Sequence, residues 1–282
     1  MSRPRVYNTQ AIVLNKAELG EADRILTLYT PHLGKLKAVA KGVRRPESKL
    51  GGHVELLNWS KMLLACGQNL DIISQSQTIE SFLPLHDDLQ RLSYAFYVAE
   101  LVDRFTPQRD ENFPVFRLLL DTLHQLCQSC DGELILRYFE LRLVDYLGYR
   151  PQLQQCLNCH SPLRPAAHFF TPSGGVLCPH CAHQEAIIYP LSLNALKVLR
   201  FLQSSDFTAI TRLRLSPDLS GELRQIMQGY ISYLLGREVN SAQWLDRLRR
   251  ETQQSWGYSS EGERSVRIRE SGGSNPPIST VS

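Results

Sequence analysis

Long apolar runs are missing from this chain of 282 residues. A membrane-spanning helix needs about 18 or more consecutive apolar residues, and no segment approaches that length. The opening residues, MSRPRVYNTQ, have no apolar stretch after their arginines, so we expect no secretion signal and a cytoplasmic protein. With 43% apolar residues, 21% charged residues and a mean hydropathy of -0.23, the composition is typical of a soluble globular protein.

Familiar catalytic motifs are missing as well. The sequence has no G-x-S-x-G, no H-E-x-x-H, no P-loop and no G-x-G-x-x-G, and its histidines are scattered without recognisable partners. We therefore expect a protein that is not an enzyme. An active site of an unrecognised kind stays open as an alternative.

The first eighty residues alternate between β-rich stretches and turns. Leu19-Gly20, Pro31 to Gly34, Gly51-Gly52 and Gly67 to Asn69 supply the turn chemistry. Five short strands in so few residues predict a small barrel over residues 1–82, either an OB-fold or, as the main competitor, an SH3-like barrel. The expected strands are Val6 to Leu14, Asp23 to Thr30, Lys35 to Gly42, Val54 to Ala65 and Leu70 to Phe82.

After Pro84 the apolar residues recur with the spacing of an α-helix, which predicts a second, α-helical domain over residues 83–250. The segment ELILRYFELRLVDYLGY is apolar nearly all round and ends at Gly148, so it is expected to be the buried central helix. Ser192 is placed to cap a helix through Leu202. Other expected helices follow Leu89 to Ala99, Phe116 to Leu126, Leu219 to Gly236 and the segment SAQWLDRLRR.

Four cysteines form two C-x-x-C pairs separated by eighteen residues: Cys156, Cys159, Cys178 and Cys181. Each pair can place two thiolates around one ion, and two pairs complete the tetrahedral shell of structural zinc. The sequence therefore predicts one structural Zn²⁺ in a zinc-ribbon-like insertion at about 152–186. The alternatives are reduced cysteines without metal, or a histidine ligand from His160, His180 or His183.

The remaining cysteines give weaker patterns. Cys127 and Cys130 form a third C-x-x-C pair, but it lies on a helical pattern without a matching second pair, so structural cysteines are favoured over redox chemistry. Cys66, beside a turn, is expected to be a small core residue.

The stretch KLKAVAKGVRRPESK concentrates positive charge on the barrel. Period-two spacing predicts that Lys35, Lys37 and Lys41 face solvent while alternate small apolar residues face the core. An OB-fold binds oligonucleotides on the face of its second and third strands, so these residues are candidates for contacts with phosphates. The alternative is an edge strand whose lysines prevent aggregation. The candidate DNA contacts are Lys35, Lys37, Lys41, Arg44, Arg45 and Lys49, with Tyr7, Tyr29 and Trp59 as possible base-stacking residues.

Several segments together resemble the bacterial DNA repair protein RecO family. They are the run from QAIVLNKAELG to VRRPESKLGG, the helical ELVDR, the segment FELRLVDYLGYRPQLQQCLNC and the closing CPHC. The resemblance spans roughly residues 5 to 250. It implies an α+β multidomain protein: an N-terminal OB-fold, a helical domain and a zinc-binding insertion.

The resemblance also implies a function in DNA repair and homologous recombination. Such a mediator binds single- and double-stranded DNA and anneals complementary strands. With RecR it assists the loading of RecA onto DNA coated by the single-stranded-DNA-binding protein, and it acts at the nucleoid. The coating protein is expected to dock in an apolar groove with a basic rim in the helical domain, near Arg91, Arg104 or Arg142.

Two alternatives come from other classes: a zinc-containing nucleic-acid-modifying enzyme, and a protein scaffold that binds no DNA. A mediator binds DNA without altering it, which distinguishes it from the enzyme. The scaffold would bind no DNA at all, which distinguishes it from the mediator. Residues 251–282 are low in apolar residues and predict a disordered tail.

Overall fold

The structure is a computed structural model that describes residues 5–128, 131–163, 167–183, 185, 187–210 and 212–250. The predicted tail of residues 251–282 and Cys130 lie outside these ranges, so the expectations about them stay predictions. Residues up to Ala242 form one compact unit, and a second begins at Gln243. The barrel and the helices from α1 to α8 belong to the first unit.

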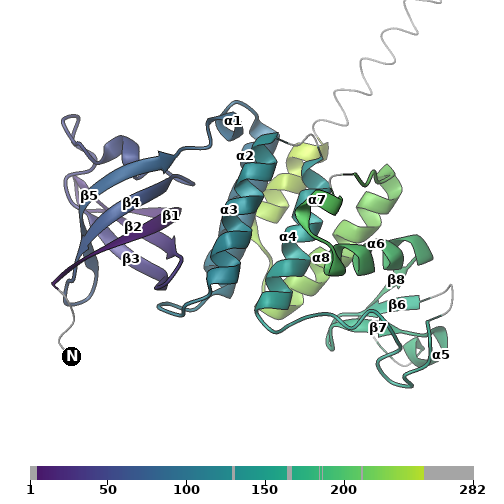
Figure 1. Cartoon of the computed structure of the whole chain (residues 1–282). Helices are drawn as coiled ribbons and strands as arrows, with labels where there is room; N and C mark the ends of the chain where they lie inside the picture. The colour runs from purple at the N-terminus through teal and green to yellow at the C-terminus, as the bar shows by residue number, and fades with distance from the viewer. Residues whose placement is uncertain are drawn as a thin grey trace, which may run out of the picture. The chain divides into compact units, whose positions relative to one another are not determined.

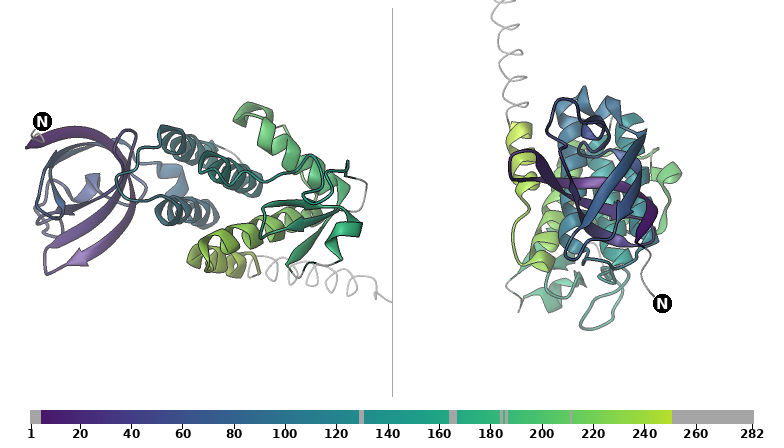
Figure 2. Two further views of the ribbon diagram at one scale, coloured as in Figure 1. Left: turned by 90° about the horizontal axis from the view of Figure 1, so that it is seen from below. Right: turned by 90° about the vertical axis from the view of Figure 1, so that its left-hand side faces the viewer.

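Five strands close into the predicted N-terminal barrel (Figures 1 and 2). Neighbours follow the order β1-β2-β3-β5-β4, and β1 pairs again with β4. All pairs are antiparallel except β3 with β5. This is the OB-fold topology, so the fold class expected from the sequence is confirmed. The strands are β1 (Val6–Leu19), β2 (Asp23–Thr30), β3 (Gly34–Ala40), β4 (Trp59–Ala65) and β5 (Asp71–Glu80).

Alternating apolar residues fill the barrel. Ala11 and Val13 of β1, together with Leu36 and Ala38 of β3, lie in one buried cluster. Strand β1 is longer than the predicted Val6 to Leu14 because a bulge between Val13 and Asn15 lets it bend and continue. One strand can therefore pair with β4 through its first half and with β2 through its second.

The connection between β3 and β4 is longer than the sequence pattern indicates. Strand β3 ends at Ala40 and β4 begins at Trp59, whereas the apolar residues from Val54 onward predicted strand. Val54 and Leu57 are buried, but they lie in a loop that contains the short 3-10 helix η1 (Gly51–His53). Leu57 has a φ of 69°, which is incompatible with a strand.

The helical region is built around α4 (Gly132–Tyr146), which packs against α2, α3, α6 and α8 (Figure 1). This confirms the expected central helix. The side chains of Asp88, Asp131, Ser192 and Ser216 each accept a backbone hydrogen bond at the start of a helix. The other helices are α1 (Leu83–His86), α2 (Leu89–Phe105), α3 (Phe113–Gln128), α6 (Leu193–Ser204), α7 (Phe207–Ile210) and α8 (Pro217–Leu235), and residues 240–250 are helical too.

Helix α4 also buries an ion pair. The Arg137 guanidinium lies 2.6 Å from the Glu140 carboxylate, and the Tyr97 hydroxyl donates a 2.7 Å hydrogen bond to that carboxylate. Both charged side chains are almost fully shielded from solvent. Removing one member of a buried pair of this kind lowers the stability of the fold, because the other charge is then buried without a partner.

A three-stranded sheet, which the sequence pattern did not define, follows α4. Strand β6 (Ala167–Phe170) pairs with β7 (Gly175–Leu177) on one side and β8 (Ile188–Leu191) on the other. The short helix α5 (Pro179–Ala182) lies between β7 and β8 in the chain. Strand β8 extends this sheet past residue 186, where the insertion was expected to end.

Several polar contacts join the start of β3 and the buried Asp71 to the segment between α2 and α3. The Arg109 backbone N–H donates to the Lys35 carbonyl at 2.8 Å, and the Arg109 guanidinium lies 2.8 Å from the buried Asp71 carboxylate. Gly34 has a φ of 62°, and a Cβ there would lie 1.9 Å from the Asp110 carbonyl oxygen. Only glycine permits this close approach. None of the described helices has the length and apolar character needed to cross a bilayer.

Candidate metal centre and nucleic-acid interface

The four predicted metal ligands come together. The sulfur atoms of Cys156, Cys159, Cys178 and Cys181 all lie within 4.8 Å of one another, and Cys159 and Cys178 are 3.8 Å apart. Zinc–thiolate bonds of about 2.3 Å in a tetrahedron place sulfur atoms about 3.8 Å apart. The cluster therefore has the dimensions of a four-thiolate metal site.

Two tight turns present these thiols. In the first, the His160 N–H donates to the Cys156 carbonyl at 3.0 Å, and the Cys156 N–H donates to Ser161 at 3.0 Å. In the second, Cys178 directly follows β7 and its carbonyl accepts from the Cys181 N–H at 3.1 Å. A small apolar cluster, which includes Leu177 and Ala182, packs behind the turns.

The thiols differ in acidity. Burial alone would raise the pKa of Cys156, but backbone N–H groups, among them that of Cys178 at 3.4 Å, donate to its sulfur and lower that pKa to about 6. The Ser161 hydroxyl lowers the pKa of the exposed Cys159. The hydrogen bond with Cys178 raises the pKa of Cys181 to about 12. Crowded thiols resist releasing all their protons, and a bound cation would remove that resistance.

Cysteine alone makes up this donor set. Among the described residues, the only group of three or more Cys, His, Asp or Glu side chains placed to hold a metal is this one, and none of the three nearby histidines belongs to it. The four thiols can therefore hold a metal ion. A shell filled by four protein ligands leaves no open position for a reacting water, which suits a structural metal.

Of the six basic residues that were expected to face solvent on the barrel, Lys35 is buried and the other five are exposed. Lys35 does not face solvent: it is 9% exposed, lies 3.1 Å from the Asp103 carboxylate and also donates to the Asp103 carbonyl. The reason is that α2 and α3 cover this end of the β2–β3 face, where Tyr29 also packs against Phe116. The expectation of an exposed amine at Lys35 is therefore wrong.

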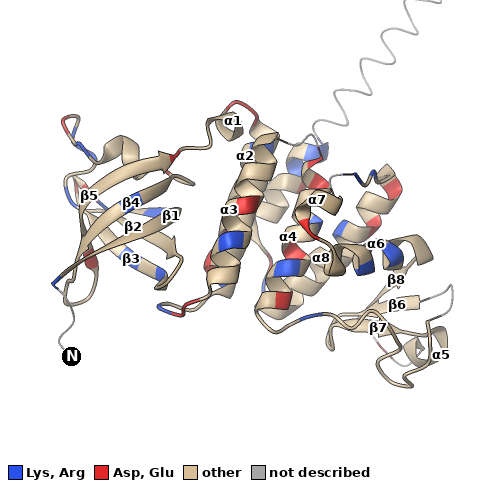
Figure 3. Ribbon diagram, viewed as in Figure 1, with Lys and Arg blue, Asp and Glu red and all other residues tan. Residues whose placement is uncertain are grey.

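The other five basic residues, Lys37, Lys41, Arg44, Arg45 and Lys49, are exposed on β3 and the loop after it. Arg44 lies 3.3 Å from Glu18. In the described part of the chain, none of the other four takes part in an ion pair. Figure 3 shows basic residues on β3 and in the barrel loops, where acidic residues also lie, and residues of both signs on the helices. A surface of this kind can contact phosphates.

The three aromatic candidates are in different places. Tyr29 is fully buried, so it is a core residue. Tyr7 and Trp59 are half-buried and line a cleft beside α3. Phe113 and Lys61 line the same cleft, although sequence patterns did not single them out. The position of Lys61 between alternating core residues of β4 was the available signal.

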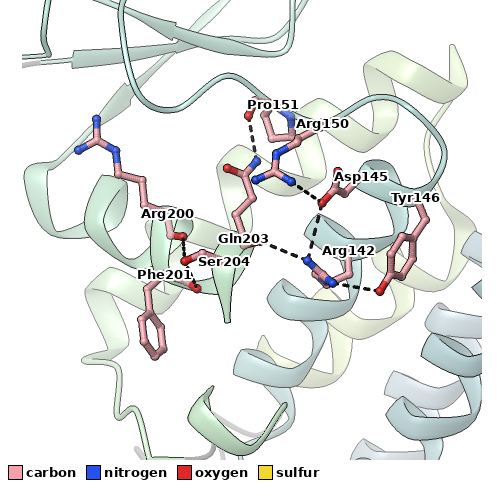
Figure 4. A network of polar contacts seen from close by, with 9 residues as sticks. All are labelled: Arg142, Asp145, Tyr146, Arg150, Pro151, Arg200, Phe201, Gln203 and Ser204. Atoms are coloured by element: carbon pink, nitrogen blue, oxygen red, sulfur yellow. Dashed lines mark hydrogen bonds and ion pairs between the residues drawn. The ribbon is translucent and has the colours of Figure 1, made fainter. Parts of the chain in front are cut away.

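The arginines proposed as a dock for the coating protein are held in internal contacts. Arg91 donates to the Cys127 carbonyl at 2.8 Å, and Arg104 lies 2.5 Å from Glu100. Arg142 donates to Tyr146 at 3.0 Å and to the Gln203 carbonyl at 3.2 Å, and lies 3.7 Å from Asp145 (Figure 4). These guanidinium groups stabilise the helical region, and their role in docking stays a prediction.

Comparison with known proteins gives consistent matches. The family model for the recombination protein O N-terminal region matches residues 1–82, and the model for its C-terminal region matches residues 86–243. A protein named DNA repair protein RecO from Dehalococcoides mccartyi is 42% identical over 251 residues, which cover 89% of this chain and 99% of the relative.

Two further relatives carry the same name. The protein from a Roseiflexus species is 42% identical over 88% of this chain and 87% of its own length. The protein from Pelotomaculum thermopropionicum is 37% identical over 86% of this chain and 94% of its own length. The chain therefore belongs to the recombination protein O family of DNA repair proteins, which are recombination mediators and not enzymes.

Proposed function

We propose that this DNA repair protein acts by binding single- and double-stranded DNA and annealing complementary strands. In the same proposal, it works with RecR to assist RecA loading on DNA coated by the single-stranded-DNA-binding protein, at the nucleoid. Residues 1–82 and 83–250 act as its two domains. The observation that carries the proposal is an OB-fold barrel with exposed cations on β3 and the following loop, within a chain that belongs to this family.

Phosphate contacts explain how such a surface could anneal strands. Lys37, Lys41, Arg44, Arg45 and Lys49 neutralise backbone charge, which reduces the repulsion between two strands held close together. Contacts to phosphates leave the base edges free to pair. The reaction needs no nucleotide hydrolysis, which agrees with a sequence that has no P-loop.

An annealing assay tests this function. Two complementary labelled strands are mixed with the purified full chain, without ATP or added metal, first naked and then coated with the single-stranded-DNA-binding protein. We expect faster pairing in both cases, and further assistance of RecA filament formation on coated DNA when RecR is present. If naked strands pair no faster at a protein concentration that saturates binding, the mediator mechanism is wrong.

Matched charge variants identify the surface responsible. Lys37→Ala with Arg45→Ala should slow annealing, whereas Lys197→Ala with Arg237→Ala removes the same charge from exposed positions on the helical region and should leave the rate unchanged. Equal losses in the two double variants would show that net charge, and not the barrel surface, determines binding.

We also infer that the four-cysteine cluster holds one structural Zn²⁺, because its sulfur spacing fits a tetrahedral shell. When bound, the ion would tie the turn at Cys156 and Cys159 to the turn at Cys178 and Cys181. Elemental analysis of protein purified without chelator should give one zinc per chain. Cys159→Ser should lose the metal, whereas Cys66→Ser, outside the cluster, should retain it. A metal-free wild-type protein would refute the assignment.

A further inference from the structure

A cleft of about 800 Å³ lies between the outer side of the barrel and the first half of α3. Its walls come from the start of β1, from β4, from the turn between β2 and β3, and from α3. The volume falls within the range of small-ligand sites in proteins, which is about 300 to 1,000 Å³. It is large enough for a nucleotide.

The lining of the cleft carries charge of one sign. It contains Lys61, Arg109 and Arg117 and neither Asp nor Glu. Lys61 is exposed and takes part in no ion pair in the described part of the chain, and the Arg117 side chain is 64% exposed although it pairs with Asp121. Glu111 lies outside the lining, 3.3 Å from His32. Arg109 is paired with Asp71, so the Lys61 amine is the cation of this lining that is available to an anionic group of a ligand.

The cleft also exposes a flat aromatic surface. The rings of His32 and Phe113 stack with centroids 5.7 Å apart and an interplanar angle of 11°. Phe113 is 47% exposed although it is large and apolar. It begins α3, where the Asn112 side chain accepts a 3.1 Å hydrogen bond from Val115 and fixes the first turn. An exposed ring in such a parallel stack suits a planar partner.

Amide side chains lie on the opposite wall. Asn8 and Gln10 are exposed on β1 and line the cleft, and Gln10 is paired in register with Lys61 of β4. Amides both donate and accept hydrogen bonds, as base edges do. The combination of a stacked ring pair, polar amides and the exposed Lys61 amine matches a nucleobase joined to a phosphate.

We propose that this cleft binds an unpaired base of single-stranded DNA by stacking on Phe113, with Lys61 contacting the adjoining phosphate. The inference rests on the proposed DNA binding and gives the protein a second contact, separate from the basic residues of β3 and its loop. Bases in a duplex are already stacked on their neighbours, so the site selects single strands.

Equilibrium binding of a fluorescent oligodeoxythymidine and of a duplex to the full chain tests the site. Stacking contacts are worth roughly a tenfold change in affinity per base or more. Phe113→Ala should weaken single-strand binding about tenfold, leave duplex binding unchanged and leave the salt slope unchanged. Lys61→Ala should instead make the salt slope shallower by about 0.7, the share of one phosphate on a single strand.

Two controls protect the interpretation. Phe201→Ala removes a phenylalanine of similar exposure, 39%, from α6 and should alter neither affinity. Phe113→Tyr retains the ring and should restore single-strand binding. Thermal melts of all variants report on folding. If the strand carries 2-aminopurine, its emission should be quenched by the wild type and less by Phe113→Ala.

Other outcomes separate this inference from the proposed function. If Phe113→Ala binds single strands like the wild type while Lys37→Ala with Arg45→Ala weakens binding, the cleft site is wrong and the barrel surface stands. If the wild type binds no DNA, both fail. A synthetic peptide of four aspartates and a phenylalanine is the remaining probe: if Phe113→Ala loses only peptide binding, the cleft accepts an acidic peptide and the proposal is overturned.

Discussion

Replacing Lys37 and Arg45 with alanine should flatten the salt dependence of single-strand binding. Of the six basic residues expected to contact DNA, all but Lys35 are exposed. Each neutralised phosphate on a single strand contributes about -0.7 to the slope of log affinity against log salt concentration. The five contacts on β3 and the loop after it therefore contribute a slope of about -3.5 by themselves, which is a loss of about 100-fold between 50 and 200 mM salt. Three contacts give about -2.1 and about 20-fold.

Lys35 supplies a matched test, because it lies two residues from Lys37 on the same strand. Its amine is bound to Asp103, so Lys35→Met removes a charge that was never available to DNA. We expect an unchanged salt slope and a lower free energy of unfolding, by about 1–3 kcal/mol, because Asp103 loses its partner.

The assay is fluorescence anisotropy of a labelled oligodeoxythymidine at three or more salt concentrations, with urea unfolding of each variant alongside. If the double variant retains a slope near that of the wild type, the exposed residues do not contact phosphates. If Lys35→Met flattens the slope as strongly, the separation of a buried structural lysine from exposed binding residues is wrong.

Three further predictions follow from the structure. In protein treated with a chelator, iodoacetamide should label Cys159 before Cys181, because Cys159 is exposed with a lowered pKa and the pKa of Cys181 is raised to about 12. Peptide mass spectrometry that finds the reverse order would contradict this. Burial would raise the pKa of Asp71, but hydrogen bonds from Tyr7 and Arg109 keep it below its usual value, so this carboxylate stabilises the fold above about pH 4 and loses that effect as the pH falls further. Urea unfolding between pH 3 and pH 6 should show Asp71→Asn to be less stable near pH 6 and less sensitive to acid, and equal acid sensitivity would count against the argument. Gly34→Ala should lower the melting temperature, because the left-handed backbone alone costs about 1–2 kcal/mol and the new Cβ meets a carbonyl oxygen; an unchanged calorimetric melt would show that the loop moves freely.

Local patterns were sufficient for the features that depend on neighbouring residues. Period-two alternation with intervening turns predicted the barrel, and the spacing of four cysteines predicted their cluster. The all-round apolar character of ELILRYFELRLVDYLGY predicted the central position of α4. In each case the signal lies within one segment or in a motif with fixed spacing.

Long-range contacts explain the rest. Lys35 is paired with Asp103 of α2, which is distant in the sequence. Period-two alternation takes no account of such a partner, so it predicted that the Lys35 amine faces solvent. Strand β8 pairs with β6 although the turn with Cys178 and Cys181 lies between them in the chain, and the β8 sequence Ile-Tyr-Pro-Leu has no regular alternation. The cleft beside α3 joins β1, β4 and α3, so no single segment shows its combined charge and aromatic surface.

The pairing of Asp71 with Arg109 bears on how the chain folds as it leaves the ribosome. The barrel is synthesised first, yet the cation that neutralises its buried carboxylate comes 38 residues later, between α2 and α3. A nascent barrel ending near residue 82 has the Tyr7 hydroxyl for this carboxylate but no cation. We therefore expect the barrel to reach full stability only when the first helices have emerged and docked, so that barrel and helices unfold together in a single cooperative transition.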